Sequence, residues 1–258
     1  MSLSKRTFRL LLTILSLAGG SLFFAGAHAE SLRVGFFDLP PHSIQDATGV
    51  AHGAAIEYVK QITDRMGISD VEFIQYPLPR LLLMLEQERM DVVILLAKSP
   101  ERASKFSFTQ TPLYSAQPVI SVRATQTLDS ITSAKDLLPL KIGMWQNGYQ
   151  SPLLNNTGQN LHTLTGNQVV SKGVAMVVAG RIDGFYFPDA YALDYEVERS
   201  KLQGKIKILP MPEPELAFYS VFSKSAGEHF LARYEQALSA QQTEAPYETF
   251  LIRELAGD

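Results

Sequence analysis

The sequence predicts an α/β protein folded as two lobes with a cleft between them. Strands and helices alternate over residues 32–97, and a second set of strands and helices begins near residue 140. Two extended segments, 118–123 and 217–222, connect the two sets. Alternating strands and helices form parallel sheets that are covered on both faces. One continuous doubly wound sheet is the alternative, and the extended connections favour two lobes joined by two crossovers.

The first 29 residues are laid out as a secretory signal peptide. Three basic residues precede an uncharged apolar run over residues 10–27, and Ala27 and Ala29 lie where a signal peptidase reads small side chains. An uncleaved membrane anchor is the alternative, because the run approaches the roughly 20 residues that span a bilayer. Gly19, Gly20 and the small residues at the end favour cleavage, so we expect the mature chain to begin at residue 30.

The composition excludes several chemistries. The chain has no cysteine, which excludes disulfide scaffolds, thiolate metal sites, thiol nucleophiles and a lipid anchor on the mature chain. The whole chain holds 23 Lys and Arg against 26 Asp and Glu. Three of the basic residues lie in the leader, so the mature chain carries 20 against 26, a formal charge of −6. This acidic surplus argues against a nucleic-acid partner, and we expect a soluble, monomeric protein exported to the bacterial periplasm.

The first lobe is expected over residues 30–122, with a C-terminal return over residues 218–258. Apolar residues at the spacing of one helical face predict a helix over residues 53–66, and Pro79 begins the next helix. The expected strands of this lobe are 32–37, 71–76 and the almost wholly apolar 90–97. Two C-terminal helices are expected around 226–241 and 246–255.

The second lobe is expected over residues 123–217. Its expected strands are 140–145, 183–187 and 205–209. A helix over residues 169–179 ends at Gly180, the residue type that most often ends helices. Ligands of α/β sheets bind beyond the carboxyl ends of the strands, so we expect a site where the strands of both lobes end.

Several short motifs follow one another along the mature chain. They are Leu32-Arg-Val-Gly35, Ser99-Pro-Glu-Arg102, Phe106-Ser-Phe108, Pro112-Leu-Tyr114 and Gly180-Arg-Ile-Asp183. In this order they resemble the bacterial extracellular solute-binding proteins of family 3, the polar-amino-acid type, which are periplasmic partners of ABC importers. The resemblance implies the type 2 periplasmic-binding-protein fold, in which each lobe is a mainly parallel sheet flanked by helices and two extended hinge crossovers join the lobes. It also implies that the lobes close on a small polar solute.

In the first lobe, the resemblance implies that Arg102 binds a carboxylate of the solute, a task that suits a planar and permanently charged guanidinium. A surface arginine in a turn is the alternative. Members of the family carry hydroxyl groups just before this arginine, whereas this chain has Leu95, Leu96 and Ala97 there and keeps only Ser99. We therefore expect a pocket floor less polar than that of a typical amino-acid site.

In the second lobe, the loop after residues 140–145 contains Gly148 and Tyr149. Backbone N–H groups at a helix N-terminus would bind an anion there. Gly148 would let a ligand approach closely, and Tyr149 would stack on the ligand, wall it off or simply pack in the core. The resemblance also implies an amine-binding Asp, which aligns with Pro188 when no gap is allowed. Asp189, one residue further on, is the candidate, and a helix N-cap is its alternative role.

Four further residues complete the expected cleft. Phe37 and Asp38 follow the first strand, where the ring would pack on a ligand and the carboxylate would meet a cation, or both would be turn structure. Tyr114 and Trp145 are expected cleft walls, with the core of the second lobe as the alternative for Trp145. His42, directly after a Pro-Pro pair, is interpreted as a histidine satisfied within its turn.

Three function classes remain open. The first is capture of a small polar, carboxylate-bearing solute, an amino acid or a relative of one, for an ABC importer, with an inner-membrane permease as partner. The second is a periplasmic lyase of the cyclohexadienyl-dehydratase type on the same fold, and the third is a ligand-sensing module for a membrane receptor. The mature chain has no nucleophile elbow, zinc-binding or nucleotide-binding motif, and its histidines lack metal-ligand spacing. We expect a binding protein that is not an enzyme and needs no cofactor or metal.

Overall fold

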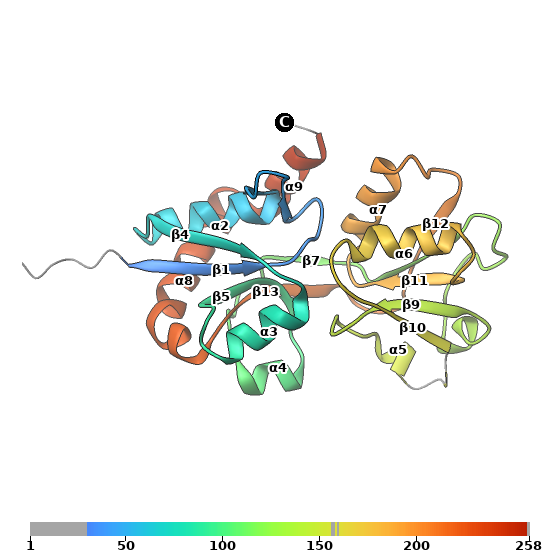
Figure 1. Cartoon of the computed structure of the whole chain (residues 1–258), viewed down its shortest axis with the longest axis horizontal. Helices are drawn as coiled ribbons and strands as arrows, with labels where there is room; N and C mark the ends of the chain where they lie inside the picture. Colours follow the sequence, from blue (N-terminus) through green and yellow to red (C-terminus); the bar gives the residue numbers. More distant parts are fainter. Residues whose placement is uncertain (1–29, 156–157, 159, 257–258) are drawn as a thin grey trace, which may run out of the picture. The chain divides into compact units, whose positions relative to one another are not determined.

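The computed structural model describes residues 30–155, 158 and 160–256. The predicted signal peptide lies outside these residues. From Ser31 onward, the described chain forms one compact unit that contains two main sheets (Figure 1). No helix in the described part of the chain is long and apolar enough to cross a bilayer.

The first sheet has a parallel centre with antiparallel additions. Its parallel strands are β1 (Ser31–Phe36), β4 (Asp70–Gln75) and β5 (Val92–Ala97). The antiparallel strands are β13 (Leu216–Phe222), β6 (Ser107–Phe108) and β7 (Tyr114–Ala116). The order is β4-β1-β5-β13-β6, with β7 also paired to β13. The chain therefore returns to its first sheet late in the sequence.

Helices cover both faces of the first sheet. They are α2 (Ala54–Arg65), α3 (Leu78–Glu86), α4 (Pro100–Lys105), α8 (Lys224–Glu244) and α9 (Tyr247–Ala256). α2 buries Ile56, Val59 and Ile62 and packs against α8 and α9. α3 packs on the other face (Figure 1), where a Cβ added to Gly35 of β1 would lie 2.8 Å from the Leu81 side chain. A hairpin of β2 (Ile44–Gln45) and β3 (Ala51–His52) precedes α2.

The second sheet follows the same plan. Its parallel strands are β9 (Lys141–Trp145), β10 (Asn160–Leu164) and β11 (Gly184–Phe187), and its antiparallel strands are β8 (Val119–Arg123) and β12 (Ile206–Pro210). Its helices are α6 (Val169–Val178), α7 (Ala190–Arg199), α5 (Pro152–Asn155) and the short 3-10 helix η1 (Ala134–Leu137). α6 packs on the sheet and on α7, while Leu137 and Leu154 pack with Ile142 in a separate apolar cluster. The predicted two-lobed α/β fold is confirmed.

Two strands of the second sheet differ from the sequence-based expectation. Most of the expected crossover 118–123 is strand β8, which lies between β11 and β12 inside the second sheet. Its β-branched residues suit this buried position. The sequence does not predict β10, because its residues are largely polar and exposed at the sheet edge.

The two passages of the chain between the sheets are tied to each other. One passes through Gln117 and Pro118, between β7 and β8, and the other runs from Met211 to Glu215, between β12 and β13. Gln117 Nε2 donates hydrogen bonds to the carbonyl oxygens of Met211 at 3.0 Å and Glu213 at 3.2 Å. The chain therefore passes from the first sheet to the second, and back again, a few residues before the lobe boundaries expected from the sequence at 122/123 and 217/218.

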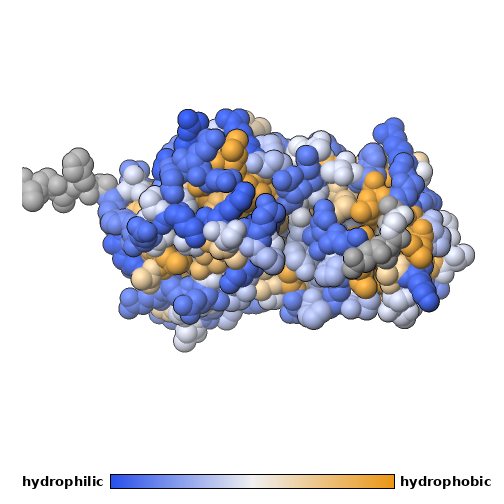
Figure 2. Space-filling model, turned by 90° about the horizontal axis from the view of Figure 1, so that it is seen from below, coloured by the Kyte–Doolittle hydropathy of each residue, from blue (hydrophilic) through white to orange (hydrophobic). Residues whose placement is uncertain are grey.

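The surface is largely polar. Figure 2 shows a face on which hydrophilic residues predominate and apolar residues appear in separate areas. Exposed large apolar side chains belong to several elements, among them Leu83 of α3 and Ile252 of α9. Scattered exposure of this kind is ordinary for folded proteins.

Close packing of α6 on the second sheet can be tested at Gly173. A Cβ added to Gly173 would lie 2.5 Å from the Phe185 ring. We expect Gly173→Ala to lower the free energy of unfolding by about 1–2 kcal/mol, because overpacking outweighs the gain of about 1 kcal/mol in helix propensity. Denaturant unfolding measures the change. Val178→Ala, at an exposed position of the same helix, should alter stability by less than about 0.5 kcal/mol; an equally small effect of Gly173→Ala would contradict the close contact.

Candidate functional site

Arg102 lies just beyond the carboxyl end of β5. The strand ends at Ala97, and Ser99 caps α4 with its hydroxyl oxygen, which accepts a hydrogen bond from the Arg102 N–H at 3.2 Å. Pro100 opens the helix at a position where a missing N–H is tolerated. The Ser99 hydroxyl is therefore engaged in a local role, and its main effect on the site is to fix the start of α4.

The Arg102 guanidinium connects the two sheets. Nη1 donates to the carbonyl oxygen of Ala97 at 2.8 Å, and Nη2 donates to that of Asn147, in the loop after β9, at 2.6 Å. Burial lowers the pKa of Arg102 from its ordinary value, but a guanidinium stays protonated in proteins. Within the described residues it makes no ion pair and no further hydrogen bond. The other N–H groups of the guanidinium are therefore available to an anionic ligand.

A cavity of about 20 Å³ lies beside Arg102 between the two sheets. Its lining includes Phe37, Leu95, Leu96, Ala97 and Phe218 from the first sheet and its loops, and Trp145, Gly148, Tyr149, Phe187, Pro188 and Asp189 from the second. Among the described residues, Arg102 and Asp189 are the charged members of this lining. The volume suffices for about one water molecule. Arg102, Gly148 and Tyr149 also border a neighbouring cavity of about 630 Å³, whose lining includes Ser99.

Apolar side chains form the walls and floor of the cavity. The Phe37 ring meets Trp145 edge-on with centroids 5.0 Å apart, and Trp145 stacks on Phe187 at 6.1 Å. Leu95 has φ 65°, and β5 shifts register against β13 near this point. Such an irregularity breaks the alternation of side chains along a strand, and both Leu95 and Leu96 reach the cavity. The floor of the cavity carries apolar side chains in place of hydroxyl groups, as the sequence predicts.

Asp189 enters the lining from the start of α7. It is fully buried and caps the helix through Oδ1, which accepts a hydrogen bond from the Ala192 N–H at 3.3 Å. Its Oδ2 accepts a hydrogen bond from the Tyr114 hydroxyl at 2.7 Å and lies 2.9 Å from Nε2 of His42. The two positions considered from the sequence, in the cleft and at a helix N-cap, therefore coincide in one side chain.

His42 and Tyr247 complete a buried cluster that the sequence does not indicate. His42 Nδ1 and Tyr247 Oη are 2.6 Å apart. The imidazole stacks on Tyr114 with centroids 4.7 Å apart, and Tyr114 stacks in turn on Tyr247 and Phe218. The interpretation of His42 as a histidine satisfied within its turn is wrong, because its partners are Tyr247 and Asp189, which belong to distant parts of the chain.

Burial controls the electrostatics of this cluster. By itself, burial would raise the pKa of the Asp189 carboxyl, but the His42 imidazole and the hydrogen bonds from Tyr114 and Ala192 outweigh it and hold the pKa below its ordinary value. Burial, together with the nearby Asp189 charge, raises the pKa of Tyr114 and of Tyr247 well above its ordinary value. Asp189 is therefore an anion surrounded by hydroxyl groups that stay protonated.

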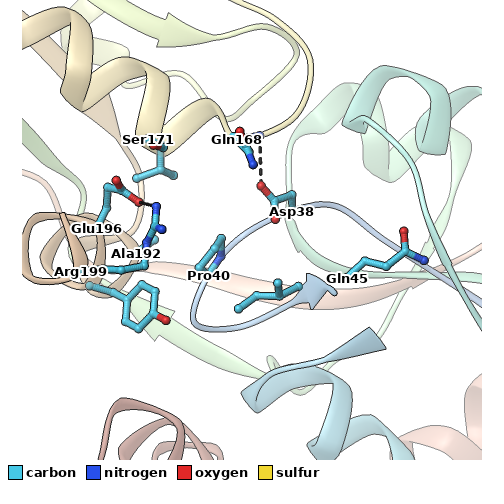
Figure 3. A pocket seen from close by; sticks show the side chains of 11 residues that line it. Asp38, Pro40, Gln45, Gln168, Ser171, Ala192, Glu196 and Arg199 are labelled. Atoms are coloured by element: carbon cyan, nitrogen blue, oxygen red, sulfur yellow. Dashed lines mark hydrogen bonds and ion pairs between the residues drawn. The ribbon is translucent and has the colours of Figure 1, made fainter. Parts of the chain in front are cut away.

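Asp38 faces a different cavity. This second cavity has a volume of about 290 Å³ and also has walls from both parts of the molecule (Figure 3). Asp38 Oδ2 accepts a hydrogen bond from the N–H of Gln168, at the start of α6, at 3.1 Å. Burial raises the pKa of the Asp38 carboxyl. Glu196 and Arg199, which also line this cavity, form an ion pair at 2.7 Å.

Comparison with known families decides what kind of protein carries this fold and cleft. Residues 32–250 match the bacterial extracellular solute-binding proteins, family 3. The chain belongs to this family. The match spans both sheets and most of the described chain. No curated protein sequence matches the chain.

Solved structures share the fold of this solute-binding protein. An amino acid ABC transporter substrate-binding protein from Streptococcus pneumoniae, bound to L-arginine, has a TM-score of 0.74 at 19% identity, covering 88% of this chain and 94% of that one. The arginine-, lysine-, histidine-binding protein ArtJ from Geobacillus stearothermophilus has a TM-score of 0.74 at 18% identity, covering 89% and 96%. A histidine kinase sensor domain with similarity to periplasmic binding proteins has a TM-score of 0.75 at 21% identity, covering 88% and 96%. At these identities the likeness is one of fold.

Most of the site residues predicted from the sequence line the small cavity of this solute-binding protein. Those in the lining are Phe37, Arg102, Trp145, Gly148, Tyr149 and Asp189. Three others lie outside it. Ser99 caps α4, Asp38 faces the second cavity, and Tyr114 contacts Asp189.

The lowered pKa of Asp189 predicts acid sensitivity. Its ionised form contributes stability that is fully present above the unfolded-state pKa of about 3.9 and is lost as the pH falls through the lower folded-state value. We expect Asp189→Asn to cost about 3 kcal/mol near neutral pH, because it removes the buried carboxylate around which the Tyr114 hydroxyl, the Ala192 N–H and the His42 imidazole are packed, and to flatten the loss of stability at acid pH. Denaturant unfolding at neutral and acid pH measures both effects.

Asp38→Asn is the matched control for Asp189→Asn. Because the folded state raises the pKa of Asp38, the ionised carboxylate is the disfavoured form there, and its contribution to stability falls as the pH rises. An asparagine oxygen can still accept the Gln168 N–H. We expect stability near neutral pH to stay the same or to increase. Equal losses in the two variants would contradict the difference between the two sites.

Proposed function

We propose that this solute-binding protein captures a small carboxylate-bearing solute between its two lobes and presents it to an ABC importer. The proposal rests on the Arg102 guanidinium, a half-buried cation beside the cavity that has no ion-pair partner among the described residues. A carboxylate matches the geometry of a guanidinium with two parallel hydrogen bonds. The carboxylate of the solute would supply the missing anion.

The position of the cavity supports the same proposal. It adjoins the carboxyl ends of β5, β9 and β11, where ligands of α/β sheets bind. Closure of the lobes excludes water and strengthens each charge-assisted hydrogen bond. The cavity is far smaller than the roughly 300–1,000 Å³ of ordinary ligand pockets. The lobes would therefore separate to admit the solute, about the two connections that Gln117 ties together.

The proposed setting is the bacterial periplasm. Members of the family are extracellular solute-binding proteins. In the proposed arrangement, residues 1–29 are removed on export, residues 30–117 and 216–258 form one lobe, and residues 118–215 form the other, which moves the expected bounds to the points where the chain changes sheet. The mature protein would act as a monomer whose partners are the solute and an inner-membrane permease. The mass of the exported protein tests the cleavage site.

The proposed activity is binding without catalysis. A lyase of the cyclohexadienyl-dehydratase type needs an acidic group that can give a proton to the leaving group. Asp189 is the acidic residue of the described lining, but it is ionised and bound by His42, Tyr114 and the N–H of Ala192. Formation of product from prephenate by the purified protein would contradict this reading.

Sensing is the second candidate function, because a histidine kinase sensor domain shares the fold. The two candidates differ in the partner that receives the loaded protein. Genes for a permease and an ATPase beside that of this protein would support import. A neighbouring receptor gene without them would support sensing.

We expect Arg102→Ala to abolish binding of the captured solute, because the substitution removes the cation that neutralises its carboxylate. Thermal unfolding of the mature protein is measured with small carboxylates, amino acids and polyamines, since a ligand that binds only the folded state raises the midpoint. Breaking a buried charge pair costs about 3–5 kcal/mol. This corresponds to a loss of more than about 100-fold in affinity.

Arg89→Ala is the control for this substitution. Arg89 is an exposed arginine in the loop between α3 and β5, and every thermal shift should persist without its side chain. A ligand whose shift survives Arg102→Ala unaltered would contradict the proposed role of Arg102.

A further inference from the structure

The small cavity offers a ligand one uncompensated charge, and that charge is positive. Arg102 and Asp189 are the charged residues of its described lining. The Arg102 guanidinium donates only to the backbone carbonyl groups of Ala97 and Asn147, so it forms no ion pair in the described part of the chain and only the through-space attraction of the neighbouring Glu101 favours its charge. Asp189 differs, because the protein itself compensates its charge.

Three groups of the protein surround the oxygen atoms of the Asp189 carboxylate. The Ala192 N–H donates to Oδ1, the Tyr114 hydroxyl donates to Oδ2, and Nε2 of His42 lies 2.9 Å from the same Oδ2. Neither Tyr114 nor His42 belongs to the cavity lining, so Oδ2 is directed toward groups outside the cavity. A ligand ammonium that displaced these groups would leave the buried Tyr114 hydroxyl without an acceptor and would take the carboxylate away from the buried His42 Nε2, and both changes are unfavourable.

His42 and Tyr114 are fixed by an aromatic stack. Ring centroids are 4.7 Å apart for His42 and Tyr114, 4.9 Å for Tyr114 and Tyr247, and 4.8 Å for Tyr114 and Phe218. The Tyr247 hydroxyl also lies 2.6 Å from His42 Nδ1. All four side chains are buried. Releasing Asp189 would therefore require the rearrangement of a closely packed cluster.

The rest of the described lining offers an ammonium group no free anion, only the faces of aromatic rings, which are a weaker partner than a carboxylate. Leu95, Leu96, Phe37 and Trp145 line the cavity together with Tyr149, whose neutral side chain cannot neutralise a cation. An ammonium group buried without an anionic partner is strongly disfavoured. An apolar ligand body gains free energy on the same surface.

We infer that the cleft selects carboxylates that have an apolar body and lack an α-amino group. The inference rests on the proposed function and narrows its solute from amino acids and related carboxylates to non-amino carboxylates. His42 and Tyr114 are positioning residues in this arrangement, because they act on the ligand through Asp189. Arg102 binds the carboxylate directly.

Matched ligand pairs that differ only in the ammonium group test the inference. The pairs are acetate and glycine, propanoate and alanine, 4-methylpentanoate and leucine, and 3-phenylpropanoate and phenylalanine. The increase in the thermal unfolding midpoint ranks the ligand pairs. Calorimetry then gives the dissociation constants of the ligands that raise the midpoint. We expect the carboxylate of the best pair to bind at least about tenfold more tightly than its amino acid, because the buried ammonium finds no free anion.

Two variants test the positioning residues. His42→Phe keeps a ring in the stack but removes the imidazole from Asp189, and Tyr114→Phe removes a single hydroxyl donor. Both should move the affinity ratio of the best pair toward the amino acid. A purely structural role would weaken both ligands alike and leave the ratio unchanged. Tyr219→Phe, on β13 and outside both the described lining and the buried cluster, should leave the ratio unchanged.

The outcomes separate the inference from the proposed function. A preference for carboxylates that narrows in His42→Phe and Tyr114→Phe supports the inference. Equal or tighter binding of the amino acids, lost in Arg102→Ala, overturns the inference and leaves the proposed function standing. A preference that neither positioning variant changes overturns the role of His42 and Tyr114. Absence of any shift with all eight ligands overturns carboxylate capture itself, and the inference with it.

Discussion

The buried carboxylate of Asp189 is the constraint on which the arrangement of the two lobes depends. An ionised carboxylate removed from water needs donors, since its burial is otherwise strongly unfavourable. Asp189 obtains them from α7, from β7 and from the loop after β1. These segments belong to both parts of the molecule, so satisfying one charge fixes the start of α7 against the first sheet. The wall of the cleft near Asp189 follows from that contact.

Arg102 is the electrostatic counterpart of Asp189. It is half-buried and also connects the two sheets, but it does so through the backbone carbonyl groups of Ala97 and Asn147, which carry no net charge. One charge of the cleft is thus compensated by the protein and the other is not. This asymmetry gives the cavity its polarity, with Arg102 on one side and mainly apolar side chains around it. In the proposed function, the carboxylate of the solute would bind at Arg102.

The sequence predicts those features that depend on neighbouring residues. Apolar runs such as 90–97 and one-sided helices such as 53–66 locate the central elements, and Arg102 stands in a local turn after a strand. β10 is not predicted, because the sequence of a polar edge strand resembles that of a loop. β8 is predicted as a crossover, because an extended segment can be either a strand within a sheet or a connection. The partners of His42 are not predicted from the sequence for another reason. Tyr247 lies 205 residues from His42 in the sequence, and no local sequence pattern indicates a contact between residues so far apart.

The position of Tyr247 has a consequence for how the molecule is assembled. This residue begins α9, the last described helix, and holds His42 near the other end of the chain. Contacts between such distant residues close very long loops and form late in folding. The parallel strands β4, β1 and β5 can pair earlier, whereas β6 and β7 need β13, which lies late in the sequence. The buried cluster that joins the two lobes can therefore form only after the chain has been synthesised as far as Tyr247.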